Sequence, residues 1–183
     1  AHLDDALQAP VNHQHFDGFR MGDSTETKYK PLERIPGMNI GGWFDAGDYD
    51  LRTGSHCSTV SSFVDSWEHF GIKRDETLVD QQQRYVDIHH PDGKADILQQ
   101  IEHGTLNLIA QHRAFGRAIT TIIEPNLHQY HHLGDAVNIT DNLNYNPKLK
   151  MYESDGFSSG TPDDRWVFTN RSSRTNYSSL VAL

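Results

Sequence analysis

The sequence predicts an all-α fold, because apolar residues recur at helical spacing and no stretch alternates apolar and polar residues as a half-buried strand would. The clearest stretch follows Thr53. Its apolar residues fall at i, i+3, i+4, i+7 and i+10, which is one face of a helix: Val60, Phe63, Val64, Trp67 and Phe70. Gly71 comes next and is suited to end the helix in the left-handed conformation.

A second helix is predicted from about Ala95 to Phe115, with Gly116 able to end it. Its expected apolar face holds Ile97, Leu98, Ile101, Leu108 and Ile109. A third helix is predicted to begin near 172–176 and to run to the end of the chain. Segment 72–91 is expected to be a polar-faced helix. Residues 1–50 and 125–171 are expected to be loops, with at most a short strand in the first, and the aromatic content of the second favours a functional loop.

Composition limits the possible partners. The 183 residues carry a formal net charge of -9, and lysine and arginine form no run, so nucleic acid is not expected as a partner. A neutral ligand such as a sugar is compatible with this charge. Cys57 is the single cysteine, which excludes an internal disulfide and leaves the cellular compartment open. No apolar run reaches ~18 residues, so no membrane partner is expected. The start lacks the features of a signal peptide, and the end stops inside an apolar run without a helix-stopping signal, so we expect the chain to be part of a longer protein.

Three carboxylates lie within the stretch GGWFDAGDYD at 41–50. Asp45 and Asp48 are spaced i, i+3, which places both side chains on one side of a turn or first helical turn. Such a pair can hold a water molecule and deprotonate it. The alternative from spacing alone is a solvated, acidic turn in front of a helix. Both interpretations remain open at this point.

Metal sites are not expected. The acidic stretch does not fit a calcium loop, because Arg52 would stand at a ligand position and Gly54 would come one place late. His128 and His132 have the i, i+4 spacing of a zinc site, but no glutamate lies between them and Gly134 follows closely. No phosphate-binding glycine loop is present. The sequence therefore predicts neither a metal nor another cofactor.

The acidic stretch, followed by an amphipathic helix, resembles the signature of glycoside hydrolase family 9, whose members include endoglucanases. The resemblance implies that Asp48 is the general base and that Asp45 positions the nucleophilic water. It also implies an (α/α)6 barrel, which requires on the order of 300 residues. The chain would then be the N-terminal portion of the catalytic domain, with entry loops in 1–50, helices and loops in 53–183, and the C-terminal remainder as its partner.

Weaker similarities extend this resemblance through ADILQQIEHGTLNLIAQH, HLGDA and SSGTPDDRWVF. The loop contents are similar to a bacterial branch of the family that includes exo-β-glucosaminidases, and Asp163 or Asp164 could pair with a substrate amine. The alternative is that these aspartates cap a turn at Pro162. Glucose and glucosamine substrates are both retained. The expected substrate-binding residues are Tyr49, Tyr130, His131, Asp164 and Trp166, whereas Trp43 is expected to anchor the turn.

The expected activity is hydrolysis of β-1,4-glycosidic bonds with inversion. This reaction needs a base and an acid roughly 6.5–9.5 Å apart. The resemblance places the acid at a glutamate beyond residue 183, and no motif surrounds Glu124 or Glu153. The 183-residue chain alone is therefore expected to be inactive. Two rival interpretations are a non-catalytic β-glycan-binding module and an acidic helical scaffold without a ligand.

Overall fold

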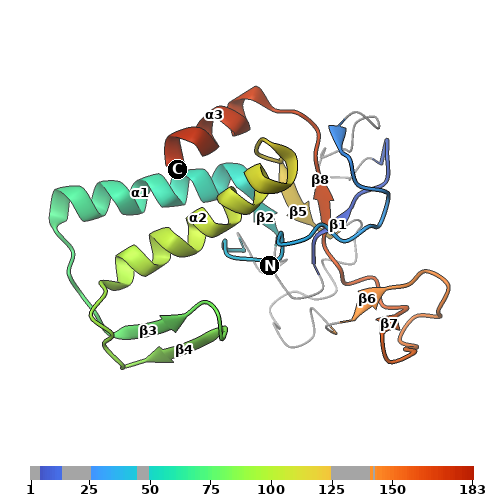
Figure 1. Ribbon diagram of the computed structural model, residues 1–183, viewed down its shortest axis with the longest axis horizontal. Coiled ribbons are helices and arrows are strands. Elements are labelled where there is room, and N and C mark those ends of the chain that lie inside the picture. The colour runs from blue at the N-terminus through green and yellow to red at the C-terminus, as the bar shows by residue number, and fades with distance from the viewer. Residues whose placement is uncertain (1–4, 14–25, 45–49, 125–140, 142) are drawn as a thin grey trace.

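The computed structural model describes residues 5–13, 26–44, 50–124, 141 and 143–183, and within these ranges the chain is α+β (Figure 1). Three helices pack beside a four-stranded mixed sheet, and two further strand pairs lie apart from that sheet. The prediction of an all-α fold, and with it of an incomplete (α/α)6 barrel, is therefore wrong. Segments expected to be loops or a helix supply the strands.

The helices lie where the apolar spacing predicts them. α1 spans Thr53–Phe70, α2 spans Asp96–Phe115 and α3 spans Ser173–Ala182. α1 packs against both α2 and α3. Gly71 and Gly116 end the first two helices in the left-handed conformation, with φ of 56° and 68°. The side chain of Ser172 accepts a hydrogen bond from the Thr175 N–H at 3.1 Å, which caps α3.

The buried face of α2 differs from the predicted one. Of the expected apolar residues only Leu108 is fully buried, while Gly104, Ala110 and several amides share the interior. Asn107 Nδ2 donates to the Ile40 carbonyl at 3.1 Å, and Gln111 Nε2 donates to Thr53 Oγ1 at 3.0 Å. These amides are buried because they satisfy backbone and hydroxyl groups that would otherwise lose their contact with water.

A β-hairpin replaces the helix expected in 72–91. β3 (Thr77–Asp80) and β4 (Tyr85–Ile88) pair antiparallel. Their β-branched and aromatic residues suit a strand, and Asp80 Oδ1 accepts the backbone N–H groups of Gln82 and Gln83, each at 2.9 Å. This local turn competes successfully with the helix. Sequence periodicity missed it because each strand has only 4 residues.

The central sheet has the order β1-β8-β5-β2. Its strands are β1 (Leu7–Gln8), β8 (Trp166–Phe168), β5 (Thr121–Ile123) and β2 (Leu51–Arg52). β1 runs parallel to β8, whereas β5 runs antiparallel to both β8 and β2. A third pair, β6 (Asn144–Tyr145) with β7 (Ser158–Ser159), is parallel.

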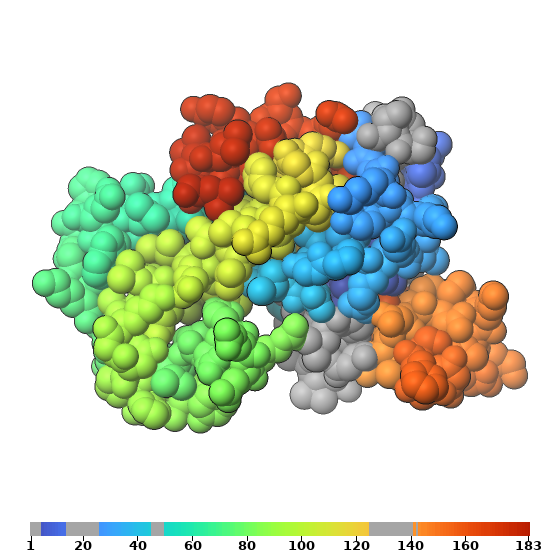
Figure 2. All heavy atoms as spheres, in the orientation of Figure 1, coloured from blue at the N-terminus to red at the C-terminus, as the bar shows by residue number. Residues whose placement is uncertain are grey.

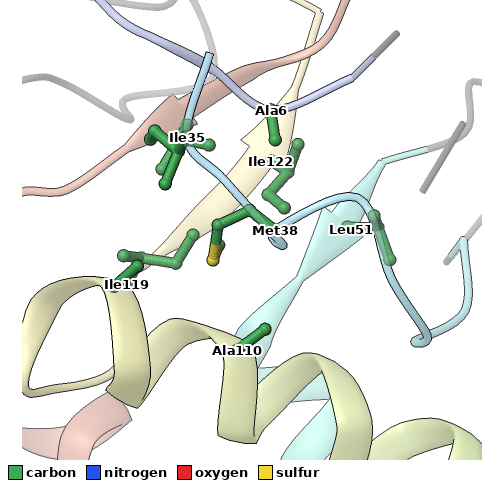
Figure 3. Close-up of a cluster of buried hydrophobic side chains, with 9 residues drawn as sticks. Ala6, Ile35, Met38, Leu51, Ala110, Ile119 and Ile122 are labelled. Carbon is green, nitrogen blue, oxygen red and sulfur yellow. The ribbon is translucent and has the colours of Figure 1, made fainter. Parts of the chain in front are cut away.

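The main apolar core lies between this sheet and the C-terminal half of α2 (Figure 3). Ile122 and Leu51 come from the sheet, Ala110 from α2, and Ile35 and Met38 from the segment that leads to the acidic motif. Cys57 is buried within α1, where burial raises the pKa of its thiol to about 11, as expected for a small core residue. The core thus fixes the segment before the motif against both layers.

Other apolar side chains remain on the surface. They include Phe70, Tyr177, Leu180, Val181 and Leu183, which lie at the end of α1 and along α3. None of the helices in the described ranges combines the length and apolar character needed to cross a membrane.

Candidate functional site

Charged residues collect at one end of the central sheet. Asp50 directly precedes β2 and Glu124 directly follows β5, and these strands are antiparallel neighbours in which Leu51 pairs with Ile122. Asp163, Asp164 and Arg165 directly precede β8, whose Trp166 pairs with Ile123. Asp5 lies just before β1, which is parallel to β8. We call these six residues, Asp5, Asp50, Glu124, Asp163, Asp164 and Arg165, the acidic sheet end. All six are at most 2% exposed.

Arg165 is the central cation of the acidic sheet end. Its Nη1 lies 3.5 Å from Asp5 Oδ1, and its backbone N–H donates to the same oxygen at 3.0 Å. Its guanidinium carbon lies 5.4 Å from the centroid of the Phe44 ring, at the N-terminal side of the acidic motif. Arg165 thereby connects the start of β1, the start of β8 and the motif segment.

Carboxyl groups outnumber cations in this region. Arg52 donates to Asp50 at 3.1 Å and, with Arg165, faces the acidic residues. Burial raises the pKa of Glu124 to about 8, with the negative charges of Asp163, Asp50 and Asp5 adding to the effect and Arg165 opposing it. Glu124 is consequently a neutral carboxylic acid at pH 7. Neutralising one carboxyl is how a buried excess of acidic groups is tolerated.

Two aspartates of the acidic sheet end bind the backbone of the loop that precedes them in the chain, at residues 141–145. Asp163 Oδ2 accepts the Asp141 N–H, and Asp164 Oδ2 accepts the Tyr145 N–H, both at 2.6 Å. Charge-assisted bonds of this kind order a loop effectively. Asp164, predicted to bind substrate, is 1% exposed and therefore lies behind this loop.

The motif segment is fixed to the helices on its other side. Gly41 has φ of 59°, and a Cβ there would lie 2.3 Å from the His103 carbonyl. The Gly42 N–H donates to that carbonyl at 2.9 Å, and His103 Nε2 lies 2.8 Å from the Gly42 carbonyl. Burial lowers the pKa of His103, so a neutral imidazole with a proton on Nε2 fits this contact.

Trp43 anchors the turn between α1 and α2, as predicted. Its indole Nε1 donates to Gln100 Oε1 at 3.0 Å, and its ring packs edge-on against His56 and Phe63. Gly104 provides the space, since a Cβ there would lie 2.4 Å from the indole. The backbone before Asp45 is therefore held tightly in place.

Five of the seven predicted site residues lie outside the described residues, whereas Asp164 and Trp166 lie within them. Asp45, Asp48, Tyr49, Tyr130 and His131 lie outside the described residues, as do His128 and His132. Trp166, in β8, is partly buried; it packs against the cluster of Ala9, Ile123 and Phe168, and its ring lies 5.1 Å from the His13 ring, centroid to centroid.

Sequence reasoning missed Glu124 and Arg165. Glu124 ends an apolar run, TTIIE, and Arg165 stands between two aspartates and a tryptophan. A charged residue directly beside a short β-branched run is a signal for a strand end. Each residue alone, however, gives no indication that the two meet, because they are separated by a long stretch of chain.

The acidic sheet end can support acid–base chemistry next to it. A carboxyl that stays protonated at neutral pH lies among other buried acidic residues and Arg165, and a strongly raised pKa of this kind is typical of acid–base sites. In the part of the chain that the structure describes, no group of three or more histidine, cysteine or acidic side chains is arranged to hold a metal ion.

Comparisons with protein-family models, with curated proteins and with solved structures found no match to this chain.

Proposed function

We propose that the chain carries the base side of a glycoside hydrolase site that cleaves β-1,4-linked glucose or glucosamine oligosaccharides with inversion. Asp48 acts as the general base, and Asp45 positions the water that attacks the anomeric carbon. The proposal rests on the resemblance of GGWFDAGDYD to family 9 hydrolases and on one structural observation.

That observation is the pairing of β2 with β5. It brings Asp50 and Glu124 to the same end of the sheet. Asp50 is the residue after segment 45–49, and Glu124 is the residue before segment 125–140, which contains Tyr130 and His131. The segment expected to hold the catalytic side chains therefore ends, and the segment expected to hold substrate-binding side chains begins, at the same end of the sheet. A hydrolase requires this arrangement because its base and its sugar contacts must meet at one bond.

The buried charges support the proposal further. Asp50, which directly follows segment 45–49 in the chain, is fully buried beside the neutral Glu124, and buried surroundings with little polarity raise the proton affinity of a neighbouring carboxylate. A base with a moderately raised pKa removes a proton from water more effectively at neutral pH.

The general acid is assigned to a glutamate outside this chain. Glu124 has a suitable protonation state, but it is 0% exposed and so does not reach a glycosidic oxygen. Glu124 is buried at the acidic sheet end, where its neutral form reduces the number of buried negative charges. The C-terminal remainder of the catalytic domain is the partner that would supply the acid.

The second candidate function is a β-glycan-binding module that does not catalyse hydrolysis. The tight anchoring of Trp43 and the loop held by Asp163 and Asp164 favour a rigid surface, which binding alone would also need. The two candidates differ in what Asp48 does, and substitution of this residue separates them.

The test compares Asp48→Asn with Asp65→Asn, a matched change on the exposed side of α1, in the longest natural chain that contains these residues. We expect Asp48→Asn to lower kcat on β-1,4-linked oligosaccharides by about 10²–10⁴-fold, with substrate affinity nearly unchanged. Asp65→Asn should leave both unchanged. Unaltered turnover in Asp48→Asn contradicts the base assignment, and saturable binding without turnover in the unsubstituted protein identifies a binding module.

The same assay on the 183-residue chain checks where the acid lies. We expect binding without turnover. Turnover that is lost on Asp48→Asn would place the acid within these residues.

A further inference from the structure

A pocket of about 410 Å³ lies between the β3–β4 hairpin and the segment that leads to the acidic motif. Asn39, Ile40 and Gly41 form one wall, the hairpin residues 79–82 and 84–86 form the other, and His103 of α2 joins them. In Figure 2 the hairpin (green) faces the segment 26–44 (light blue) next to α2. The volume falls within the range of ~300–1,000 Å³ that is usual for small-molecule sites.

Val79, Tyr85 and Val86 are among the hairpin residues that line the pocket. Val79 and Val86 are directly opposite each other in the ladder and so share one face of the hairpin. Tyr85 also lines the pocket and is 51% exposed. A tyrosine ring offers a flat apolar face and a polar tip, which suits the C–H face and the hydroxyl groups of a pyranose.

Polar groups able to bind hydroxyls lie at the turn of the hairpin. Gln82 and Arg84 line the pocket, and their side chains form no hydrogen bond or ion pair with any described residue. A glutamine amide both donates and accepts, and a guanidinium donates in a fixed fork. Sugar hydroxyls also donate and accept, so they match this combination.

The backbone of the turn is fixed by contacts within the hairpin. The two N–H groups held by Asp80 and the positive φ of 54° at Arg84 define its backbone. A preformed wall reduces the entropy that binding would otherwise cost.

His103 connects the pocket to the acidic motif. Its Nε2 lies 2.8 Å from the Gly42 carbonyl, and its Nδ1 lies 3.5 Å from Gln81 Nε2 on the hairpin. With the proton on Nε2, the imidazole donates to Gly42 and accepts from Gln81. The hairpin and the backbone three residues before Asp45 thus share one side chain.

We propose that this hairpin pocket is a saccharide subsite, in which Tyr85 stacks on one pyranose unit and Gln82 and Arg84 bind its hydroxyls. This assignment rests on the proposed function, because the oligosaccharide bound in the pocket would be the one that Asp45 and Asp48 act on. The subsite contributes to affinity and takes no part in bond cleavage.

The test is a calorimetric titration that measures the affinity of the chain for the β-1,4-linked tetramers of glucose and of glucosamine. We expect Tyr85→Ala to weaken binding of the preferred tetramer about tenfold, through loss of one apolar contact. Gln82→Ala should weaken it severalfold, the effect of one or two hydrogen bonds. Both residues are exposed, so neither change should impair folding.

Tyr177→Ala is the matched control, because Tyr177 is a 70% exposed tyrosine on α3, outside the pocket. It should leave affinity unchanged. Equal affinity in Tyr85→Ala and the control, or no binding of either tetramer by the unsubstituted chain, overturns the subsite.

The subsite and the hydrolase can fail separately. Loss of affinity in Tyr85→Ala without Asp48-dependent turnover keeps the subsite and removes the hydrolase. Asp48-dependent turnover whose KM is the same in Tyr85→Ala keeps the hydrolase and removes the subsite.

Discussion

The two sides that hold the acidic motif are built in opposite ways. On the helix side, Trp43 fills a space between α1 and α2 that exists because residue 104 is a glycine. On the sheet side, Phe44 and Asp50 adjoin a buried cluster of carboxyls around Arg165. The helix side depends mainly on shape and the sheet side on charge balance. Burial lowers the pKa of His56 and His103 on the helix side, so that side should lose stability only as pH falls below the ordinary histidine range, whereas the sheet side should respond as pH rises toward 8.

The difference has a functional meaning. Shape complementarity fixes a backbone rigidly but does not alter the proton affinity of neighbouring carboxylates. Buried charges alter that affinity, at a cost in stability. Trp43 lies in surroundings of the first kind, and Phe44 and Asp50 lie beside surroundings of the second kind.

Arg165→Met should remove the central cation and leave buried carboxylates without compensation. We expect a loss of about 3–5 kcal/mol in the free energy of unfolding at pH 7, measured by urea denaturation. Arg174→Met, an exposed change on α3, should cost less than about 0.5 kcal/mol. A similar small loss in both variants would show that the sheet end is not held by charge balance.

The stability of Glu124→Gln relative to the unsubstituted protein should increase as pH rises. The folded-state pKa of Glu124, about 8, is raised from its usual 4.5, so its ionisation is opposed by folding. The stability of the unsubstituted protein relative to Glu124→Gln is greatest below pH 4.5 and falls as pH rises toward 8. At ~1.4 kcal/mol per pH unit, the relative change between pH 4 and pH 7 is on the order of 3 kcal/mol.

The measurement is urea denaturation of both proteins across this pH range. Glu68→Gln, an exposed change on α1, is the control and should show no such trend. A pH-independent difference between Glu124→Gln and the unsubstituted protein would mean that Glu124 is ionised in the folded state.

Gly104→Ala should destabilise the helix side by about 1–3 kcal/mol, because the new methyl group would overlap Trp43 and Val60. The effect should not change from neutral to mildly alkaline pH, where the buried His56 and His103 stay neutral, in contrast to the sheet side. Gly54→Ala in α1 is the matched control: its methyl group would meet no atom within 4 Å, and we expect a gain of up to about 1 kcal/mol. The free energies of unfolding of the two variants are measured by thermal or urea denaturation. A Gly104→Ala variant that is more stable than the unsubstituted protein would contradict the packing argument.

The sequence alone determined the local features of this protein. The spacing of Val60, Phe63 and Val64 predicted α1, and Gly71 and Gly116 predicted where two helices end. Trp43 was predicted to anchor the turn. These features depend on residues a few positions apart, so periodicity and capping preferences reveal them.

The strand pairing of the central sheet and the burial of the charged residues at its end depend on the tertiary structure and could not be predicted from the sequence. The strands of this sheet have 2–3 residues, too few for a visible alternation, and β1 pairs with β8 across almost the whole chain. Asp50, Glu124 and Arg165 each look like an ordinary surface charge in the sequence. They acquire their burial, and Glu124 its raised pKa, from neighbours far away along the chain, and desolvation by such neighbours cannot be read from local sequence.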